Sequence, residues 1–413
     1  MVEQHGKTLV PQIRFAGFTD PWEQRKLSEL VEIERGGSPR PIERYITDDP
    51  CGLNWVKIGD APELGRYITQ TTEKIKPEGL AKTRQVYPGD LVLSNSMSFG
   101  RPYIMAIRGC IHDGWLLIRD AQKHFDPIFL CHMLGAPQML NQYRMFAAGS
   151  TVNNLNKELV GKAIVSLPSK DEQREIGIVL DRLDSLITLH QRKYDKLCVL
   201  KKSMLDKMFP KGGSLYPEIR FAGFTDPWEQ RKLGDILQER NVRTSDFESN
   251  PIFSLTIEDG ITPKTDRYER TSLITKTEDL FKIVSPNEFV TNPMNLRFGA
   301  FGYNKNSFSV CVSGYYDVFS IDNDKCSGFW NSYFKTSVAL KRFDDAATGS
   351  LIEKRRVKYS TLCQLIFLMP KGMDEKKRIG AFFDRLDSLI TLHQRKLELL
   401  RNIKKSMLDK MFV

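Results

Sequence analysis

The chain has 413 residues, of which 41% are hydrophobic and 27% charged, a size and balance typical of a soluble protein with two or more domains. No apolar run approaches the ~20 residues that span a bilayer, and no secretory signal is evident, so we expect no membrane contact. Seven scattered cysteines without a C-x-x-C pair argue against disulfides or a zinc site and favour the cytoplasm. The net charge of +10 indicates an acidic partner, with nucleic acid the first candidate.

A repeated segment opens each half of the chain. After a loose tail, residues 1–10, comes Pro11–Leu27, PQIRFAGFTDPWEQRKL, which recurs at Pro217–Leu233 with one difference in 17 positions. We call these two segments the framing blocks. Their glycine, proline and aromatic residues predict a compact docking segment that leads into a short helix or strand near Glu23–Ile33.

Between the first framing block and about Pro168 lies an insert of mixed character. Short apolar runs at Trp55–Gly59, Asp90–Ser94 and Trp115–Ile118 predict strands. Asp126–Met139 and Asn156–Ile164 have helical patterns. We therefore expect an α+β domain built around a sheet.

Asp171–Phe209 is predicted to be one long helix, and it recurs as Asp374–Phe412 with 27 of 39 positions identical. Large residues repeat at heptad spacing in each copy, which predicts coiled-coil packing. One seam holds Leu180, Leu183, Ile187, Tyr194, Leu197, Met204 and Met208, and the other holds Phe383, Leu386, Ile390, Leu397, Leu400, Met407 and Met411. Because the two seams nearly coincide, each helix is the natural partner of the other.

The seams carry polar exceptions at Lys201, Lys404, His190 and His393. If the helices pair antiparallel with aligned centres, the histidines meet near the crossing and could fix the register. A metal or catalytic pair is the alternative, although no carboxylate or thiol lies beside them on the seam. The lysines could extend past the seam to water.

A breaker-rich linker, Pro210–Pro217, joins the first helix to the second framing block. The second insert follows, with strand-like runs at Pro251–Ile257, Asn287–Asn292, Phe308–Ile321 and Leu362–Pro370. An antiparallel helix pair satisfies this connectivity. It also requires the end of the second helix to dock on the first framing block, so the two chain termini should lie close together.

No catalytic motif is convincing. Asp20-Pro21-Trp22 and Asn292-Pro293-Met294 only faintly resemble methyltransferase motifs, and no glycine-rich loop offers a nucleotide or S-adenosylmethionine pocket. We find no histidine beside a nucleophile motif. The sequence therefore predicts a binding protein.

Basic, polar and aromatic residues in the inserts are the candidates for DNA contact, because arginine and lysine neutralise phosphates and polar side chains read base edges. They are Ser38, Arg40, Arg44, Asn95, Ser96, Ser98, Arg101 and Tyr103 in the first insert, and Asn241, Arg243, Arg297, Tyr303, Asn304, Lys305, Tyr315 and Tyr316 in the second. For most single positions, an ordinary solvated side chain is the competing interpretation.

The chain resembles the specificity subunit of type I restriction–modification systems. The resemblance covers essentially the whole chain. It rests on the framing blocks, the repeated helices, Gly89–Val92, Gly149–Thr151, and the L-P-x-x-x-E-Q-x-x-I run at Leu167–Ile176. The second copy of that run, Met369–Ile379, has one extra residue after the proline and Lys376 in place of the glutamine.

This resemblance implies two globular α/β target recognition domains separated by two long antiparallel helices, in a pseudo-twofold α+β arrangement. The expected segments are 1–168, 169–210, 211–370 and 371–413. Each recognition domain would read one half of a bipartite, asymmetric double-stranded DNA site, and the helices would set the gap. Methyltransferase subunits, two of them, and restriction subunits would assemble with the chain and hold S-adenosylmethionine, ATP and magnesium, so this chain itself would have neither cofactor nor catalysis.

Exposed helix residues are the candidates for methyltransferase docking. They are Arg182, Asp184, Gln191, Arg192, Arg385, Asp387, Gln394 and Arg395. The main alternative is a coiled-coil adaptor whose inserts bind proteins. A self-sufficient modification enzyme is a further alternative, weakened by the missing cofactor motif.

Overall fold

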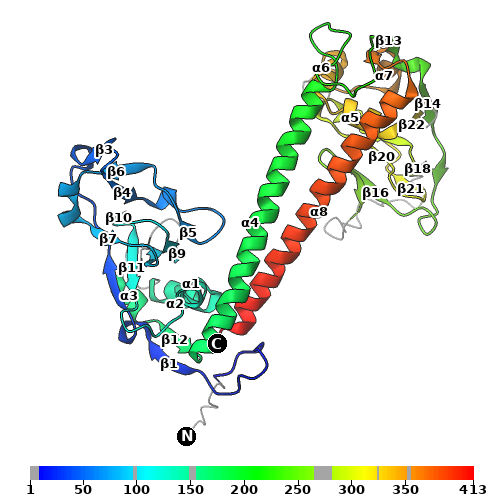
Figure 1. Cartoon of the computed structure of the whole chain (residues 1–413). Helices are drawn as coiled ribbons and strands as arrows, with labels where there is room; N and C mark the ends of the chain where they lie inside the picture. Colours follow the sequence, from blue (N-terminus) through cyan, green and yellow to red (C-terminus); the bar gives the residue numbers. More distant parts are fainter. Residues whose placement is uncertain (1–8, 96–99, 148–154, 265–280, 323–324, 351–354) are drawn as a thin grey trace. The chain divides into compact units, whose positions relative to one another are not determined.

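A computed structural model describes residues 9–95, 100–147, 155–264, 281–322, 325–350 and 355–413. The chain divides into two compact units, one formed by residues 1–193 with 393–413, and the other by residues 194–392. Each unit therefore contains one insert, one framing block and part of both long helices (Figure 1).

The first unit contains two five-stranded sheets. One has the order β2-β11-β8-β9-β5 and the other β3-β6-β4-β10-β7. The strands of the first sheet are β2 (Glu32–Arg35), β5 (Tyr67–Ile68), β8 (Leu91–Ser94), β9 (Pro102–Met105) and β11 (Trp115–Arg119). Those of the second are β3 (Ile46–Thr47), β4 (Leu53–Val56), β6 (Glu73–Ile75), β7 (Arg84–Val86) and β10 (Gly109–Ile111). The predicted strand runs Asp90–Ser94 and Trp115–Ile118 are confirmed as β8 and β11, whereas Trp55–Gly59 overlaps only the end of β4, because Ile58–Asp60 form a 3₁₀ helix.

Helical predictions for the first insert need correction. The predicted Asp126–Met139 helix is two helices, α1 (Pro127–Leu134) and α2 (Pro137–Ala147). Pro137 has no N–H to continue α1, so a new helix begins there. The predicted Asn156–Ile164 helix is the short α3 (Lys157–Gly161), and Ile164 already belongs to strand β12 (Ile164–Leu167).

The second unit contains a four-stranded sheet in the order β14-β22-β19-β20, a three-stranded sheet β15-β18-β21 and a hairpin β16-β17. Its strands are β14 (Leu237–Arg240), β15 (Arg243–Thr244), β16 (Phe253–Thr256), β17 (Gly260–Pro263), β18 (Phe281–Val284), β19 (Phe289–Thr291), β20 (Phe301–Tyr303), β21 (Val310–Val312) and β22 (Asp317–Ile321). Its short helices are α5 (Ser327–Tyr333), α6 (Ser337–Ala346) and α7 (Tyr359–Gln364). The predicted run Phe308–Ile321 is two strands, because a turn at residues 313–316 separates β21 from β22.

Both framing blocks close their inserts in the same way. Strand β1 (Glu23–Lys26) pairs antiparallel with β12, and β13 (Glu229–Lys232) pairs antiparallel with β23 (Ile366–Met369). Since β12 and β23 lead directly into the long helices, the beginning and the end of each insert meet beside a helix start.

The long helices are α4 (Lys170–Lys207) and α8 (Met373–Met411), as predicted. Within the first unit, Asp184 of α4 contacts Lys404 of α8, and His190 contacts His393. Within the second unit, Lys201 of α4 contacts Asp387 of α8. In the second unit the Phe209 ring, just past α4, also lies 5.9 Å from Phe383 of α8. Residue numbers rise along one helix as they fall along the other, which confirms antiparallel pairing in each unit (Figure 1).

The end of α8 docks on the first framing block. Ile13 N donates to Lys410 O at 3.1 Å, and the Phe412 ring lies 6.5 Å from the Trp22 ring. In the second unit, Ile219 N donates to Lys207 O at 2.9 Å, and Phe209 lies 6.1 Å from Trp228. The predicted meeting of the C-terminus with the N-terminal framing block is therefore confirmed.

Candidate nucleic-acid interface

Two loops of the first unit meet at one end of its β2-β11-β8-β9-β5 sheet. The register pairs Arg35 with Leu116 at that end, so the chain leaves β2 where it enters β11. Gly36 N donates to Trp115 O at 2.9 Å, and Gly37 N donates to Ile111 O at 3.2 Å. We call residues 36–41 and 112–114, with Asn95, the first loop end.

Asp113 contacts several other residues of the first loop end. Its carboxylate lies 3.0 Å from Ser38 Oγ and 3.7 Å from Arg40 Nη2. Its backbone oxygen accepts from Asn95 Nδ2 at 2.9 Å. The Arg40 side chain is 81% exposed, so the loop end presents a cation to solvent beside this carboxylate.

The second unit has a loop end at the equivalent place. Strands β14 and β22 pair Arg240 with Val318, so residues 241–244 lie beside the 313–316 turn. Arg243 Nε donates to Asn241 Oδ1 at 3.3 Å, and Lys282 Nζ donates to Tyr316 O at 2.8 Å. Asn241, Arg243 and Tyr315 are exposed. We call residues 241–244 and 313–316 the second loop end.

Seven predicted DNA-contact residues thus gather at these two loop ends: Ser38, Arg40 and Asn95 in the first, and Asn241, Arg243, Tyr315 and Tyr316 in the second. Arg44 is exposed nearby in the chain, in a 3₁₀ turn. Ser96, Ser98 and Gly149–Thr151 lie outside the described residues. Sequence reasoning missed Asp113 and His112, because a loop carboxylate and a lone histidine carried no motif.

Several predicted DNA contacts are corrected by burial. Asn95, Tyr103 and Asn304 are 3%, 2% and 1% exposed. The Tyr103 ring packs 5.7 Å from Trp115, and Asn304 Nδ2 donates to Val284 O and Phe308 O, each at 2.9 Å. Their polar atoms support the inserts and do not face a ligand.

Other predicted DNA contacts are engaged with neighbouring elements. Arg101 is exposed but donates to Glu63 O and lies over the Tyr103 ring. Arg297 has a 9% exposed side chain and lies 3.2 Å from Asp344. Tyr303 Oη donates to Asp384 at 3.1 Å, and Lys305 Nζ lies 3.2 Å from the same carboxylate. Tyr303 and Lys305 therefore fasten the second insert to α8.

Asp184 and Asp387, predicted as docking residues, are used inside their units. Arg66 of the first insert lies 2.7 Å from Asp184, which also pairs with Lys404. Lys201 lies 2.6 Å from Asp387, and Lys305 of the second insert lies 3.8 Å from it. The seam lysines thus neutralise helix carboxylates that also bind the inserts.

Buried titratable groups surround these ion pairs. His132 is fully buried 3.9 Å from Asp184, and burial, with the charges of Arg66 and Lys404, holds its pKa well below the usual value. In the second unit, burial and the neighbouring Lys201 lower the pKa of Lys335 to about 8. Both groups are therefore biased toward their neutral forms.

One side of the helix pair faces the insert. In the first unit, Asp184, Thr188, Arg401, Lys405 and Leu408 line a cavity of about 650 Å³ together with residues of the first insert. These five residues occupy the two heptad positions on one flank of the seam. The other flank of the pair is therefore turned away from the insert.

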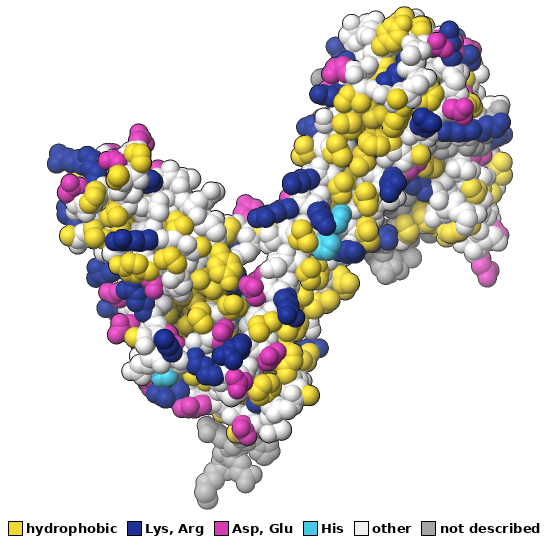
Figure 2. Space-filling model, in the orientation of Figure 1, with side chains coloured by type: hydrophobic (Ala, Val, Ile, Leu, Met, Phe, Trp, Pro, Cys, Tyr) yellow, Lys and Arg dark blue, Asp and Glu magenta, His cyan; other side chains and the backbone are white. Residues whose placement is uncertain are grey.

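That other flank exposes a row of large apolar side chains. The first unit exposes Leu186, Leu189, Leu399 and Ile403, and the second exposes Val199, Leu200, Leu389 and Leu392. Leu186 and Leu189 correspond to Leu389 and Leu392 in the duplicated sequence, so the row occurs once in each unit. We call these rows the apolar flanks; yellow side chains along the helices are visible in Figure 2. Sequence reasoning missed them, because it did not show which side of the seam the inserts cover.

The remaining predicted docking residues are polar positions on the helices. Arg182, Arg192, Arg385, Gln394 and Arg395 are exposed, whereas Gln191 accepts from Arg401 at 3.0 Å.

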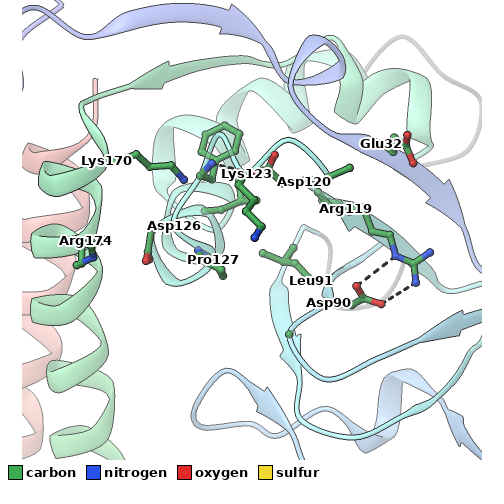
Figure 3. A pocket seen from close by; sticks show the side chains of 15 residues that line it. Glu32, Asp90, Leu91, Arg119, Asp120, Lys123, Asp126, Pro127, Lys170 and Arg174 are labelled. Carbon is green, nitrogen blue, oxygen red and sulfur yellow. Dashed lines mark hydrogen bonds and ion pairs between the residues drawn. The ribbon is translucent and has the colours of Figure 1, made fainter.

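A cavity of about 590 Å³ lies at the opposite end of the β2–β11 pair from the first loop end (Figure 3). Lys123, Lys170 and Glu32 border it, and two of its carboxylates are engaged: Asp90 pairs with Arg119 at 2.8 Å, and Asp126 caps α1. Its charges thus support the junction of insert and α4. Among the described residues, no group of three or more His, Cys, Asp or Glu side chains is placed to hold a metal, and no helix could cross a membrane.

Comparisons with known proteins agree with this architecture. Residues 19–198 match the family model described as type I restriction modification DNA specificity domain. A Methanocaldococcus jannaschii protein assigned as the type I restriction enzyme MjaX specificity subunit is 22% identical over 419 residues, covering 94% of this chain and 92% of that protein. The MjaVIII specificity subunit of the same organism is 22% identical over 253 residues, which cover 58% of this chain and 55% of that protein.

The fold also matches a solved structure. The crystal structure of the type I restriction–modification S subunit from M. genitalium aligns with a TM-score of 0.59 at 12% identity, covering 98% of this chain and 99% of that one. This likeness shows a shared fold, and within the chain residues 19–198 match the DNA specificity domain of type I restriction–modification systems.

Proposed function

We propose that each loop end reads one half of a bipartite DNA site. The observation that carries this proposal is that the two loop ends occupy equivalent positions on related frames but present different side chains. The first loop end presents Arg40 beside Asp113. The second presents Asn241 and Arg243 together with Tyr315 and Tyr316. Because the two inserts differ while the framing blocks and helices repeat, the two half-sites should differ in sequence. Two identical inserts would select identical half-sites.

The long helices would set the unspecified gap between the half-sites. α4 contains 38 residues, which at ~1.5 Å per residue gives roughly 57 Å of helix. Both units share this helix and α8, so their length is the natural determinant of spacing.

The apolar flanks would dock methyltransferase subunits. Each unit offers four exposed apolar residues on the flank of the helix pair that its insert leaves uncovered. Such a row suits helices of a partner, which would complete a bundle around the pair. Because the row occurs once in each unit, two methyltransferase subunits are expected.

Specificity subunits are not themselves catalytic, so the chemistry would belong to the partners. The methyltransferase subunits would bind S-adenosylmethionine, and restriction subunits would supply ATP- and magnesium-dependent cleavage. This chain would select the DNA sequence and position the partner subunits on it.

A binding experiment separates this function from a protein-binding adaptor. The chain would be purified with its methyltransferase subunits, and retention on duplex DNA measured against increasing salt and unrelated competitor DNA. Retention that falls with salt yet resists unrelated competitor supports the proposal. Equal retention by methyltransferase subunits alone would favour the adaptor.

A further inference from the structure

We propose that Arg40, positioned by Asp113, reads a guanine in the half-site recognised by the first insert. This inference rests on the proposed function and adds the identity of one base and the residue that selects it. Arginine can donate two parallel hydrogen bonds to O6 and N7 of guanine in the major groove, the commonest specific contact to that base.

The Arg40 side chain is exposed, and the carboxylate beside it is held in place. Its side chain is 81% exposed, while Asp113, at 29% exposure, lies 3.7 Å from it and is itself held by Ser38 Oγ at 3.0 Å. The Asp113 backbone oxygen also accepts from Asn95 Nδ2 and from Arg35 Nε. The carboxylate thus limits the directions in which the guanidinium can point, which reduces the entropy lost on binding.

The charges around Arg40 favour a base over a phosphate. A groove of about 440 Å³ is lined by Arg40, Glu43 and His112 among others. The Asp113 carboxylate offsets part of the Arg40 charge, whereas Arg35, bonded to the Asp113 backbone oxygen, is a second cation that could take a phosphate. A base edge is neutral, so it can accept from Arg40 beside this carboxylate.

His112 borders the same groove and is also fixed. Gly114 N donates to its Nδ1 at 3.0 Å, and the ring packs edge-on against Trp55 at 5.7 Å. Asp113 Oδ1 also lies 3.0 Å from this Nδ1, so the carboxylate beside Arg40 contacts the His112 ring as well.

The test is the methylated motif in DNA from cells that express the full complex. The wild-type chain should give a bipartite motif whose first half contains a required guanine. Arg40→Ala should relax that one position, lowering the preference for guanine by roughly 5- to 150-fold, and leave the second half unchanged. Arg174→Ala is the control: this arginine is exposed on α4, away from the first loop end, and its loss should keep every base preference.

Asp113→Asn tests positioning. It should weaken the preference at the same guanine while the unfolding temperature and the second half-site stay as in the wild type. A change in base preference is a readout that a purely structural role would not produce.

Binding to modified DNA covers the case in which Arg40→Ala abolishes methylation. Replacing the required guanine with 7-deazaguanine removes the N7 acceptor and should weaken wild-type binding, with no further loss for the Arg40→Ala complex. If both complexes lose affinity equally, or if Arg40→Ala keeps a strict guanine, the inference is wrong while the proposed function stands. A wild-type complex without any bipartite motif would instead overturn the proposed function.

Discussion

Arg14 holds Glu172 with two hydrogen bonds, of 2.7 and 2.8 Å, from Nε and Nη2. Arg220 holds Glu375 with the same two bonds at the same distances. Each pair joins a framing block to the start of a long helix, so the repeated sequence builds the same joint twice.

Breaking this joint should destabilise the first unit. Glu172 is fully buried, and Glu172→Gln leaves the Arg14 charge without its carboxylate, which costs about 3 kcal/mol or more. Denaturant unfolding measures this change. Glu29→Gln, which breaks an exposed pair with Arg25, is the control and should cost under about 1 kcal/mol. Equal effects would mean that the joint adds nothing beyond a surface ion pair.

The histidine layer should make the helix pair sensitive to acid. His190 Nδ1 and His393 Nδ1 are 2.8 Å apart, so one ring donates and the other must accept, and both cannot be protonated in this arrangement. Burial lowers the pKa of both rings, as do the charges of Lys193 and Lys396. Because the unfolded chain binds protons more readily, this contribution to stability is present above about pH 6.5 and is lost as pH falls below it.

Thermal unfolding between pH 5 and 8 tests this layer. A variant with both His190→Leu and His393→Leu should lose less stability on acidification than the wild type. Gln394→Leu, at an exposed position next to His393 that carries no titratable group, serves as the control and should retain the wild-type pH dependence. An unchanged acid response in the double variant would show that the layer does not titrate on folding.

Lys335 should cost stability at neutral pH. Its pKa is lowered to about 8 by burial and by Lys201, so below pH 8 folding must bury the charged lysine, and between pH 8 and about 10.4 folding releases a proton that the unfolded lysine keeps. The penalty is present below pH 8 and is relieved as pH rises from 8 to about 10.4. Lys335→Met should therefore raise stability at pH 7, on the order of 1–2 kcal/mol.

Differential scanning calorimetry at pH 7 and pH 9.5 measures that difference. The advantage of Lys335→Met should shrink at the higher pH. Lys341→Met, at an exposed position of α6, provides the control. A loss of stability in Lys335→Met at pH 7 would show that its charge is satisfied.

The apolar flanks should govern assembly. Leu189→Glu with Leu399→Glu places two charges on the first unit's flank, so one methyltransferase subunit should be lost while the other is kept. Native mass spectrometry counts the subunits. Arg192→Ala with Arg395→Ala tests the predicted polar docking residues and should leave two subunits. Loss of a subunit in the arginine variant but not in the leucine variant would show instead that docking depends on the arginines.

The framing blocks and long helices could be predicted from the sequence, because each of them occurs twice in the chain. Heptad spacing predicted α4 and α8, and connectivity predicted both their antiparallel pairing and the contact of His190 with His393. Most strand runs were also predictable, but Leu362–Gln364 of one predicted run belongs to α7. Pro137 begins a new helix where periodicity alone predicted a single one.

The site was less predictable, since residue type does not report burial. Tyr103 and Asn304 have the chemistry of DNA contacts but lie inside their inserts. Asp184 and Asp387 look like surface carboxylates on a helix, yet cations from distant insert loops reach them. Such long-range pairs leave no local pattern in the sequence.

The central claim is that each insert independently selects one half-site. The most direct test replaces residues 28–168 with a second copy of residues 234–370, which joins the same framing residues at both ends. The methylated motif is then read from DNA of cells that express this chain with its partners. If each insert selects its own half-site, the chain with two copies of the second insert should give a palindromic motif that repeats the second wild-type half-site. A motif that retains the first wild-type half-site would contradict the account.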